Sequence, residues 1–161
     1  KKPEVKRYIL LEYYIKAEGF KGITLKLFDT YGENDTRPKL INLLNKFADE
    51  NTELNMSPGE QTLNLVHVND VCRAFEIAFN LLLENEINNH PTFAIASKES
   101  YMLKDLIKIF ERATSKKVNI IWGGKPYRKR EVMKIWDKGQ ELPNWVPKIS
   151  LEKGLKRYNN I

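Results

Sequence analysis

The sequence predicts an α/β fold in which strands pair mostly in parallel. Two observations support this prediction. Apolar and β-branched runs at 22–28, 62–68 and 92–97 have the composition of buried strands. The segments between them carry apolar side chains at helical spacing over three or more turns. Strands joined by helices in this way pair in parallel, because each connection crosses one face of the sheet.

The chain is predicted to begin with a helix followed by a strand. Residues 4–18 repeat apolar side chains at helical spacing, and Gly19 follows as a stop signal. Residues 22–28, GITLKLF, are apolar enough for a buried strand and end in the turn-like run YGEND.

The middle of the chain continues the alternation. A helix capped by Asp35 or Thr36 runs to Asp49, because its leucines and Phe47 form one apolar face. A short strand at 54–56 and the turn SPGE then lead into the strand at 62–68.

The second half repeats the same order. Asn69 or Asp70 caps the next helix, and the strand TFAIAS follows it. The remaining predicted elements are a helix at 102–115, a strand at 118–122, a loop at 142–150 and a short helix at 150–158.

The composition indicates one globular domain with a basic surface. The chain has 161 residues, 42% hydrophobic and 30% charged, which is enough for a single core. A net charge of +6 favours a phosphate-bearing partner such as a nucleotide, a nucleic acid or an anionic membrane. No apolar run approaches the ~18 residues of a membrane span, and the first residues lack the apolar core of a signal peptide. A soluble, cytoplasmic protein without membrane contact is expected.

Isolated reactive residues are predicted to be structural. Cys72 is the single cysteine and lies in the apolar run VCRAFEIAF, so a buried thiol is expected. His67 stands within a strand and is expected to be packed or hydrogen-bonded in the core. Asp70 is explained by helix capping, and His90 lies in a loop without a functional signal. No metal site is predicted.

The segment GGKPYRKREVM, residues 123–133, has an unusual density of positive charge. Lys125, Arg128, Lys129 and Arg130 fall within six positions. From the residue types alone the segment is either a solvated loop or an anion-binding site. Arginine suits an anion site because its planar guanidinium donates two charge-assisted hydrogen bonds to phosphate oxygens.

Several ordered segments resemble one enzyme family. The runs LKLFDTYGEND, PKLINLL, SPGEQTLNLVHVNDVCRAF, GGKPYRKREVM and LPNWVPKISLEKGL are similar to the C-terminal half of extended short-chain dehydrogenases/reductases, the nucleotide-sugar epimerase/dehydratase family. FDTYG, SPGEQ and PYRKREVM most resemble the bacterial reductases that make CDP-abequose or CDP-paratose, precursors of O-antigen. The resemblance implies the C-terminal part of a Rossmann-like fold with its small substrate-binding domain. Residues 1–161 would form one substrate-binding portion.

The family's dinucleotide-binding and catalytic motifs do not occur in these residues. The sequence contains no GxGxxG or GxxGxxG turn, which would hold the pyrophosphate. No tyrosine stands four residues before a lysine, the pair that passes a proton during hydride transfer. Lys1 or Lys2 completes such a pair only if a tyrosine precedes residue 1. The resemblance therefore implies that an N-terminal half, absent from this sequence, binds NAD or NADP in the complete enzyme.

It follows that this chain alone is expected to bind no cofactor, to hold no catalytic residue and to be inactive. An N-terminal Rossmann half or a second copy of the chain is the expected protein partner. The chain would then be a fragment, a truncated homologue or one piece of a split enzyme.

The resemblance assigns site residues to two segments near the first strand. Leu27 would approach the nicotinamide through its backbone, and Phe28 and Asp29 would face the sugar and the diphosphate. Many family members have asparagine where this chain has Asp29, which can also be explained as the cap of a turn. Lys39 and Leu40 match the segment where a helix N-terminus approaches the diphosphate. The alternative for Lys39 is a solvated charge.

The basic segment supplies the remaining candidates. In the family pattern R-x-x-D the arginine pairs with the diphosphate and the acid reaches the nucleoside. Arg128 and Glu131 match this pattern, and Arg130 is a second candidate for the diphosphate. The phosphate-binding arginine of another family motif is replaced by Leu63, so other basic residues must provide that contact.

The expected function is binding of a nucleotide sugar, a CDP-linked 4-keto-6-deoxyhexose, within an NAD(P)-dependent reductase, epimerase or dehydratase for surface polysaccharide precursors. Two alternatives stay open. A non-catalytic binding or scaffolding protein would explain the missing catalytic pair. A nucleic-acid-binding module would use Tyr127 and Trp136 to stack on bases. Against that module, the 27 basic residues are dispersed among 21 acidic ones, and no nucleic-acid-binding motif occurs.

Overall fold

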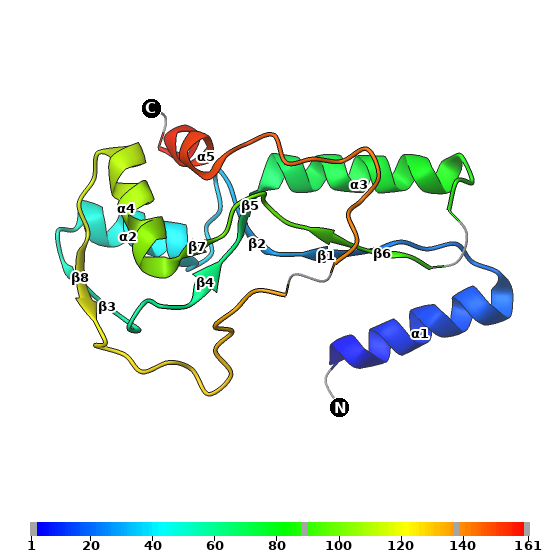
Figure 1. Ribbon diagram of the computed structural model, residues 1–161, viewed down its shortest axis with the longest axis horizontal. Helices are drawn as coiled ribbons and strands as arrows, with labels where there is room; N and C mark the ends of the chain where they lie inside the picture. The colour runs from blue at the N-terminus through cyan, green and yellow to red at the C-terminus, as the bar shows by residue number, and fades with distance from the viewer. Residues whose placement is uncertain (1–2, 88–89, 137–138, 160–161) are drawn as a thin grey trace.

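Separate strand pairs, rather than one continuous sheet, form the frame of this α/β fold (Figure 1). The computed structural model describes residues 3–87, 90–136 and 139–159. Within them, β1 pairs with β6, β2 with β5 and β3 with β8 in parallel, whereas β4 and β7 are antiparallel. The predicted class and its parallel pairing are confirmed.

The elements alternate along the chain as the sequence predicts. In order they are α1 (Pro3–Glu18), β1 (Thr24–Leu27), β2 (Asp29–Tyr31), α2 (Leu40–Asp49), β3 (Glu53–Met56), β4 (Thr62–Leu63), β5 (Leu65–His67), α3 (Val68–Leu83), β6 (Thr92–Ile95), β7 (Tyr101–Met102), α4 (Leu103–Thr114), β8 (Asn119–Trp122) and α5 (Leu151–Tyr158).

Two apolar cores divide the molecule into two lobes. In one lobe α3 packs on the β1–β6 pair, and Val66, Phe93 and Ile95 are among its buried residues. In the other lobe α2, α4 and α5 surround a core that contains Leu44 and Phe110, both fully buried. Figure 1 shows the first lobe between α3 and α1, and the second at the opposite end beside β3 and β8.

The strand predicted at 22–28 is divided at Phe28. β1 ends at Leu27, and the Phe28 N–H donates to the Ile95 carbonyl at 3.3 Å. The chain then leaves β6, and β2 pairs with β5, with Asp29 opposite Leu65. The predicted strand at 62–68 is divided at a buried residue in the same way.

That residue is Asn64, which lies between β4 and β5. Its side-chain oxygen accepts the Ser97 N–H at 2.7 Å, and its amide donates to the carbonyls of Ser97 and Glu99. A side chain therefore makes the bonds to the 97–99 segment that a continuous strand would make with its backbone.

The N-cap residues of α2 and α3 differ from the predicted ones. α2 has Lys39 at its N-cap without a side-chain cap, and Asp35 binds Arg37 instead. α3 is capped by His67, whose Nδ1 accepts the Asn69 N–H at 3.2 Å. The caps move because the extended backbone ends at Lys39 and His67, and the cap position follows the backbone rather than the residue type.

His67 is a buried core residue, as the sequence predicts. Its side chain is packed edge-on against Tyr31, and its Nε2 lies 3.2 Å from the Glu33 carboxylate. Burial lowers the pKa of His67, which keeps the imidazole neutral and able to accept at Nδ1. Its role in the fold is to cap α3 beside the β2–β5 pair.

Cys72 is exposed, contrary to the prediction of a buried thiol. α3 buries Val71, Ala74 and Ala78 against β1 and β6. Cys72 follows Val71 by one position, which turns its side chain about 100° around the helix and away from this core. The apolar run around Cys72 therefore continues onto the exposed face of α3.

Asp70 is not a cap but a buried anchor for the segment before α5. Its carboxylate accepts the N–H groups of Lys148 at 3.1 Å and Ile149 at 2.9 Å. The Arg73 guanidinium lies 3.0 Å from the same carboxylate, and the Trp145 indole donates to the Asp70 carbonyl. This residue fixes how the C-terminal segment crosses the molecule.

Among the residues that the structure covers, none of the helices combines the length and the apolar character that a membrane crossing needs.

Asp70→Ala is expected to lower the free energy of unfolding by about 1 to 3 kcal/mol, because the partly buried N–H groups of Lys148 and Ile149 lose their acceptor. Urea denaturation measures this change. Asp105→Ala is the control, since Asp105 is exposed and pairs with Lys108 on the surface, where an ion pair contributes at most about 1 kcal/mol. Equal losses in the two variants would contradict the anchoring role.

Candidate functional site

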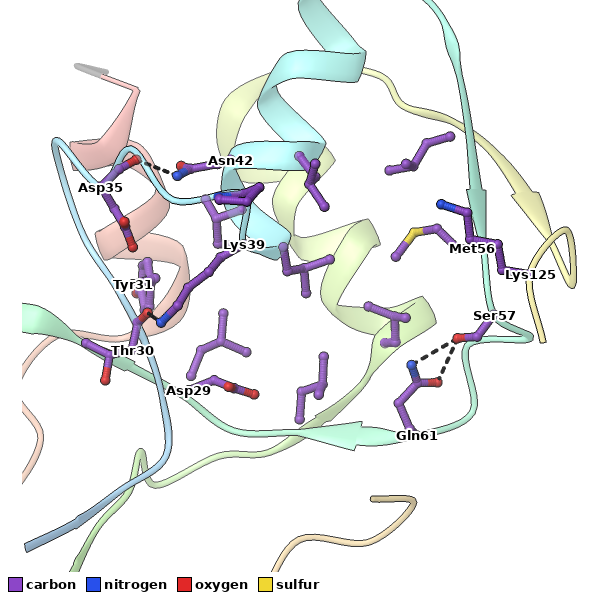
Figure 2. Close-up of a pocket in the computed structure, with 18 of the residues that line it drawn as sticks. Asp29, Thr30, Tyr31, Asp35, Lys39, Asn42, Met56, Ser57, Gln61 and Lys125 are labelled. Carbon is purple, nitrogen blue, oxygen red and sulfur yellow. Dashed lines mark hydrogen bonds between the residues drawn. The ribbon is translucent and has the colours of Figure 1, made fainter. Parts of the chain in front are cut away.

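A cavity of about 560 Å³ opens in the second lobe, between β2, α2, β3 and the basic segment (Figure 2). Figure 2 shows Asp29, Thr30 and Lys39 on one side of the cavity, and Ser57 and Lys125 on the opposite side. Residues from distant parts of the sequence thus face one space. Of the two cavities described here, of about 560 and 270 Å³, this one has more room for a ligand.

Most of the predicted site residues meet at this cavity. Asp29 from β2, Lys39 and Leu40 from the start of α2, and Arg128 and Glu131 from the basic segment all line it. The polypeptide brings them together because β2 leads into α2, while the segment after β8 contributes Arg128 and Glu131 to the same wall.

The other three predicted residues lie elsewhere. Leu27 ends β1 with 45% of its surface exposed. Phe28 lines a second, smaller cavity of about 270 Å³ together with Trp136 and Trp145. Arg130 is exposed and is not part of the wall of either cavity.

The first turn of α2 faces the cavity, and the N-terminus of this helix has no side-chain cap. Lys39 has an extended backbone, no side chain caps the helix, and its first turn contains no acid. Leu40, Ile41 and Asn42 from this turn line the cavity. The free N–H groups and the helix dipole favour an anion at this position.

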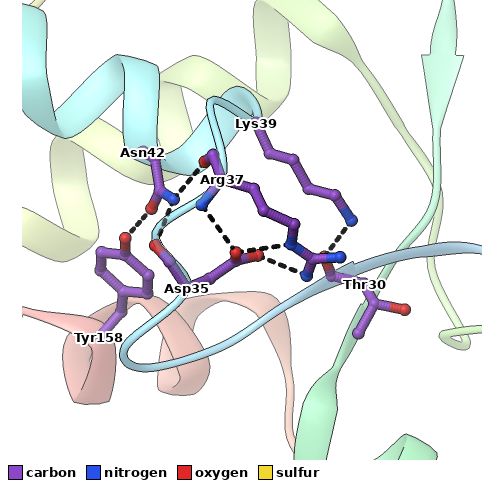
Figure 3. Close-up of polar contacts among 6 residues, drawn as sticks. All are labelled: Thr30, Asp35, Arg37, Lys39, Asn42 and Tyr158. Atoms are coloured by element: carbon purple, nitrogen blue, oxygen red, sulfur yellow. Dashed lines mark hydrogen bonds and ion pairs between the residues drawn. The ribbon is translucent and has the colours of Figure 1, made fainter.

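Lys39 adds a positive charge at the same place. Its ammonium donates to the Thr30 carbonyl at 3.3 Å, which holds it over the β2 side of the cavity (Figure 3). A cation beside a helix N-terminus is unfavourable by itself. The arrangement becomes favourable when an anion binds between them.

The basic segment is tied down at several points, which fix the backbone at Arg128. The Glu131 carboxylate accepts the Arg128 N–H at 3.3 Å, and the Glu131 N–H donates to the Arg128 carbonyl at 2.9 Å. The Tyr127 phenol accepts the Glu60 N–H at 3.1 Å, and Thr62 donates to the Met133 carbonyl. Arg128 is therefore presented from an anchored turn.

Three cations that line the cavity have no acidic partner among the residues that the structure describes. In the part of the chain that the structure describes, no carboxylate lies within ion-pair distance of Lys39, Lys125 or Arg128. Arg37 differs, since it binds Asp35 through two contacts of 2.7 Å. The cavity thus combines unpaired positive charge with an uncapped helix N-terminus.

On the opposite side of the cavity, neutral polar groups accompany Lys125. The Gln61 amide donates to the Ser57 hydroxyl at 3.0 Å, and Asn55 lies beside them on β3. Sequence reasoning assigned no role to these residues or to Lys125. Lys125 could have been found from its place in the basic cluster, whereas the polar residues of β3 have no local signal.

Among the described residues, no group of three or more His, Cys, Asp or Glu side chains is placed to hold a metal ion.

Comparison with known proteins identifies the family. Residues 5–90 match the model of the NAD dependent epimerase/dehydratase family, so the chain belongs to this family. The resemblance drawn from the sequence is confirmed at this level.

Curated relatives include two proteins named CDP-abequose synthase. The one from Yersinia pseudotuberculosis is 33% identical over 124 residues, which are 77% of this chain and 42% of that protein. The one from Salmonella muenchen is 26% identical over 137 residues, 84% of this chain and 46% of that protein. The chain spans about half the length of the curated relatives that it matches.

Solved structures of the family have the same fold. The structure of UDP-glucose 4-epimerase from Thermotoga maritima with UDP-glucose matches with a TM-score of 0.78 and 24% sequence identity. The match covers 97% of this chain and 50% of the epimerase chain. The structure of UDP-glucose-4-epimerase from Stenotrophomonas maltophila with bound NAD and formylated UDP-arabinopyranose matches with a TM-score of 0.80 and 17% sequence identity. The match covers 97% of this chain and 52% of that epimerase chain. These likenesses confirm the Rossmann-type α/β fold.

Asp35 lines the cavity and is paired with Arg37, and this ion pair can be tested by titration. The Arg37 guanidinium and N–H lower the pKa of Asp35 from its ordinary value of 3.8 to about 2. Because this pKa is depressed in the folded state, the stabilisation from the pair is present above about pH 4 and is lost as the pH falls toward about 2. In Arg37→Ala the pKa of Asp35 is expected to return toward 3.8, measured by NMR titration of the carboxyl carbon.

Lys46→Ala is the matched control for this titration, since the exposed Lys46 pairs with Glu50. It should leave the titration of Asp35 unchanged. An Asp35 pKa near 3.8 in the unmodified chain would contradict the ion pair.

Proposed function

We propose that the chain is the nucleotide-sugar-binding portion of an NAD(P)-dependent nucleotide-sugar reductase, epimerase or dehydratase. The observation that carries the proposal is the 560 Å³ cavity in which Lys39 and Arg128 meet the uncapped start of α2. Its size and its charge suit a nucleoside diphosphate linked to a sugar. Family membership supports the same assignment.

The diphosphate is assigned to the positive side of the cavity. The α2 N–H groups and the Lys39 ammonium would bind it from one side, and the Arg128 guanidinium from the basic segment. An arginine can place two hydrogen bonds on phosphate oxygens, each contributing about 1.5 to 3 kcal/mol. Lys125 extends the positive wall toward β3.

Two of the three acidic residues that line the cavity are assigned to hydroxyl groups, since the third, Asp35, is paired with Arg37. Asp29 lies at the β2 side and would accept a hydrogen bond from the sugar, while Glu131, beside Arg128, would accept one from the ribose. Carboxylates accept hydrogen bonds from neutral hydroxyl groups but repel phosphate. The acidic and basic residues of the cavity would therefore hold the ligand in one orientation.

The substrate class is proposed to be a CDP-linked 4-keto-6-deoxyhexose used for surface polysaccharide precursors. The support comes from the two relatives named CDP-abequose synthase and from the FDTYG, SPGEQ and PYRKREVM runs. The neutral polar side chains of Asn55, Ser57 and Gln61, which line the cavity together with Lys125, offer both donors and acceptors for a base.

NAD or NADP is assigned to a dinucleotide-binding half outside residues 1–161. The sequence has no Gly-rich turn to hold the pyrophosphate, and Leu27 alone is assigned to the nicotinamide side. When bound, the dinucleotide supplies hydride transfer. The residues of this chain bind the sugar nucleotide, orient it and shield it from water.

Exposed apolar surface supports this division of the protein. Phe75, Phe79 and Leu83 are 55 to 63% exposed on α3, and among the described strands β1 pairs with β6 alone. We assign this α3 face and the second edge of β1 to contact with the dinucleotide-binding half, since large apolar patches and open strand edges are normally covered. A second copy of the chain is the other candidate to cover them.

The nucleic-acid alternative is weakened by the contacts of its two aromatic residues. The Tyr127 phenol is bonded to the Glu60 N–H, and the Trp136 ring lies 4.6 Å from the Lys26 ammonium. The Tyr127 hydroxyl and the Trp136 ring are thus already engaged in intramolecular contacts. The scaffolding alternative shares the binding site proposed here and differs in lacking turnover.

Arg128→Ala is expected to weaken binding of CDP by about 1.5 to 3 kcal/mol, because the charge-assisted contacts to the diphosphate are lost. Isothermal titration calorimetry of the 161-residue chain measures the difference. Lys129→Ala, one position along, is the control, because Lys129 does not line the cavity. Equal small effects would show that the basic cluster is only surface charge.

Residues 1–161 alone should not oxidise NAD(P)H with a 4-keto nucleotide sugar, yet should bind CDP with an affinity that falls as salt rises. Adding a separately expressed dinucleotide-binding half should restore turnover, followed by the absorbance of NAD(P)H. Tight NAD(P) binding by the chain alone would overturn the assignment of the two halves. Tighter binding to single-stranded RNA than to CDP would favour the nucleic-acid alternative.

A further inference from the structure

The loop before α2 is held by a side chain from inside the helix. Figure 3 shows Asn42 reaching back so that its amide donates to the carbonyls of Asp35 and Arg37, the latter at 2.6 Å. Both amide hydrogens are used in this way. The carbonyls of the loop are therefore fixed relative to the first turn of α2.

Tyr158 completes the arrangement from the far end of the sequence. Its phenol donates to the Asn42 side-chain oxygen, across 116 positions of the chain. This bond fixes the orientation of the amide, because a flipped amide would place its NH₂ group against the phenol and its oxygen against two carbonyls. Burial and the nearby Asp35 carboxylate raise the pKa of Tyr158, so the phenol keeps its proton.

The helix that carries Tyr158 is firmly seated. α5 buries Leu151 and Leu155, with Leu155 fully buried in the core of the second lobe. Gly154 packs so closely on the Tyr31 ring that a Cβ at this position would overlap the phenol oxygen. Tyr31 also donates to the Leu151 carbonyl at 3.4 Å. α5 is thus a rigid support for a hydrogen bond to α2.

The loop itself has little other support. Asn34 has a positive φ of 62°, and the Asp35–Arg37 pair lies entirely within the loop, so this pair does not attach it to the rest of the protein. Apart from Asn42, two side-chain contacts tie this region to the β2–β5 pair: Lys39 donates to the Thr30 carbonyl, and the Glu33 carboxylate lies 3.2 Å from His67 Nε2.

We propose that Asn42 and Tyr158 form a latch that positions the anion-binding end of the cavity. The latch holds the loop at 32–39 so that Lys39 and the first turn of α2 face the diphosphate of the bound nucleotide. This inference rests on the proposed function and adds two positioning residues to it. Tyr158 acts through Asn42, whose backbone belongs to the same helix turn that receives the anion.

The test compares ligands with and without a diphosphate. In Tyr158→Phe the dissociation constant for CDP should rise about 3- to 10-fold, the effect of one lost hydrogen bond, while that for cytidine stays unchanged. NMR titration of the 161-residue chain measures both. Tyr101→Phe is the matched control, since it removes a phenol that donates to Glu99 away from the cavity, and it should change neither constant.

A double-mutant cycle tests whether Tyr158 acts through Asn42. Asn42→Ala should weaken CDP binding at least as much as Tyr158→Phe, and adding Tyr158→Phe to it should cause no further loss. Additive losses, or equal losses for CDP and cytidine, would overturn the latch by showing that Tyr158 contributes only general stability. Thermal unfolding of each variant is recorded alongside.

The two levels of the proposal fail in different ways. An unmodified chain that does not bind CDP overturns the proposed function and the latch together. An unmodified chain that binds CDP, with Tyr158→Phe binding it equally well, overturns the latch alone.

Discussion

The change of strand partner at Phe28 is the constraint on which both lobes depend. Up to Leu27 the chain pairs with β6 and belongs to the core beneath α3, and from Asp29 onward it pairs with β5. This exchange carries the chain from one lobe to the other and places Asp29 at the cavity wall. The His67 cap and the buried Asp70 follow directly after β5, so α3 and the C-terminal segment are fixed from the same junction.

The site depends on which charges are neutralised within the protein. Arg37 is bound by Asp35, whereas Lys39, only two positions later, extends over the cavity to the Thr30 carbonyl. The pairing therefore removes one positive charge at the rim and leaves another free beside an uncapped helix. Selective pairing of this kind concentrates the attraction for an anion at one place, because unpaired charges in a partly enclosed cavity are less screened than those on the open surface.

Local patterns predicted the elements well but not their ends. The helical periodicity of α4 and α5 and the apolar strands β1 and β6 agree with the structure within a few residues. The caps of α2 and α3 were wrong because Asp35 and Asp70 have stronger partners elsewhere, in Arg37 and in the 148–149 backbone. Cys72 was misplaced because apolar neighbours in sequence do not show which face of a helix is covered.

By itself, the sequence determined the α/β class, the order of the elements, the family resemblance and the candidates Asp29, Lys39 and Arg128. These follow from periodicity and short motifs, which are local properties of the chain. Tertiary structure decided that the candidates face one cavity, that Leu27 and Phe28 do not, and that Tyr158 bonds to Asn42. The physical reason is that a hydrogen bond between residues 116 positions apart depends on how α5 packs against α2, and no local pattern encodes that packing.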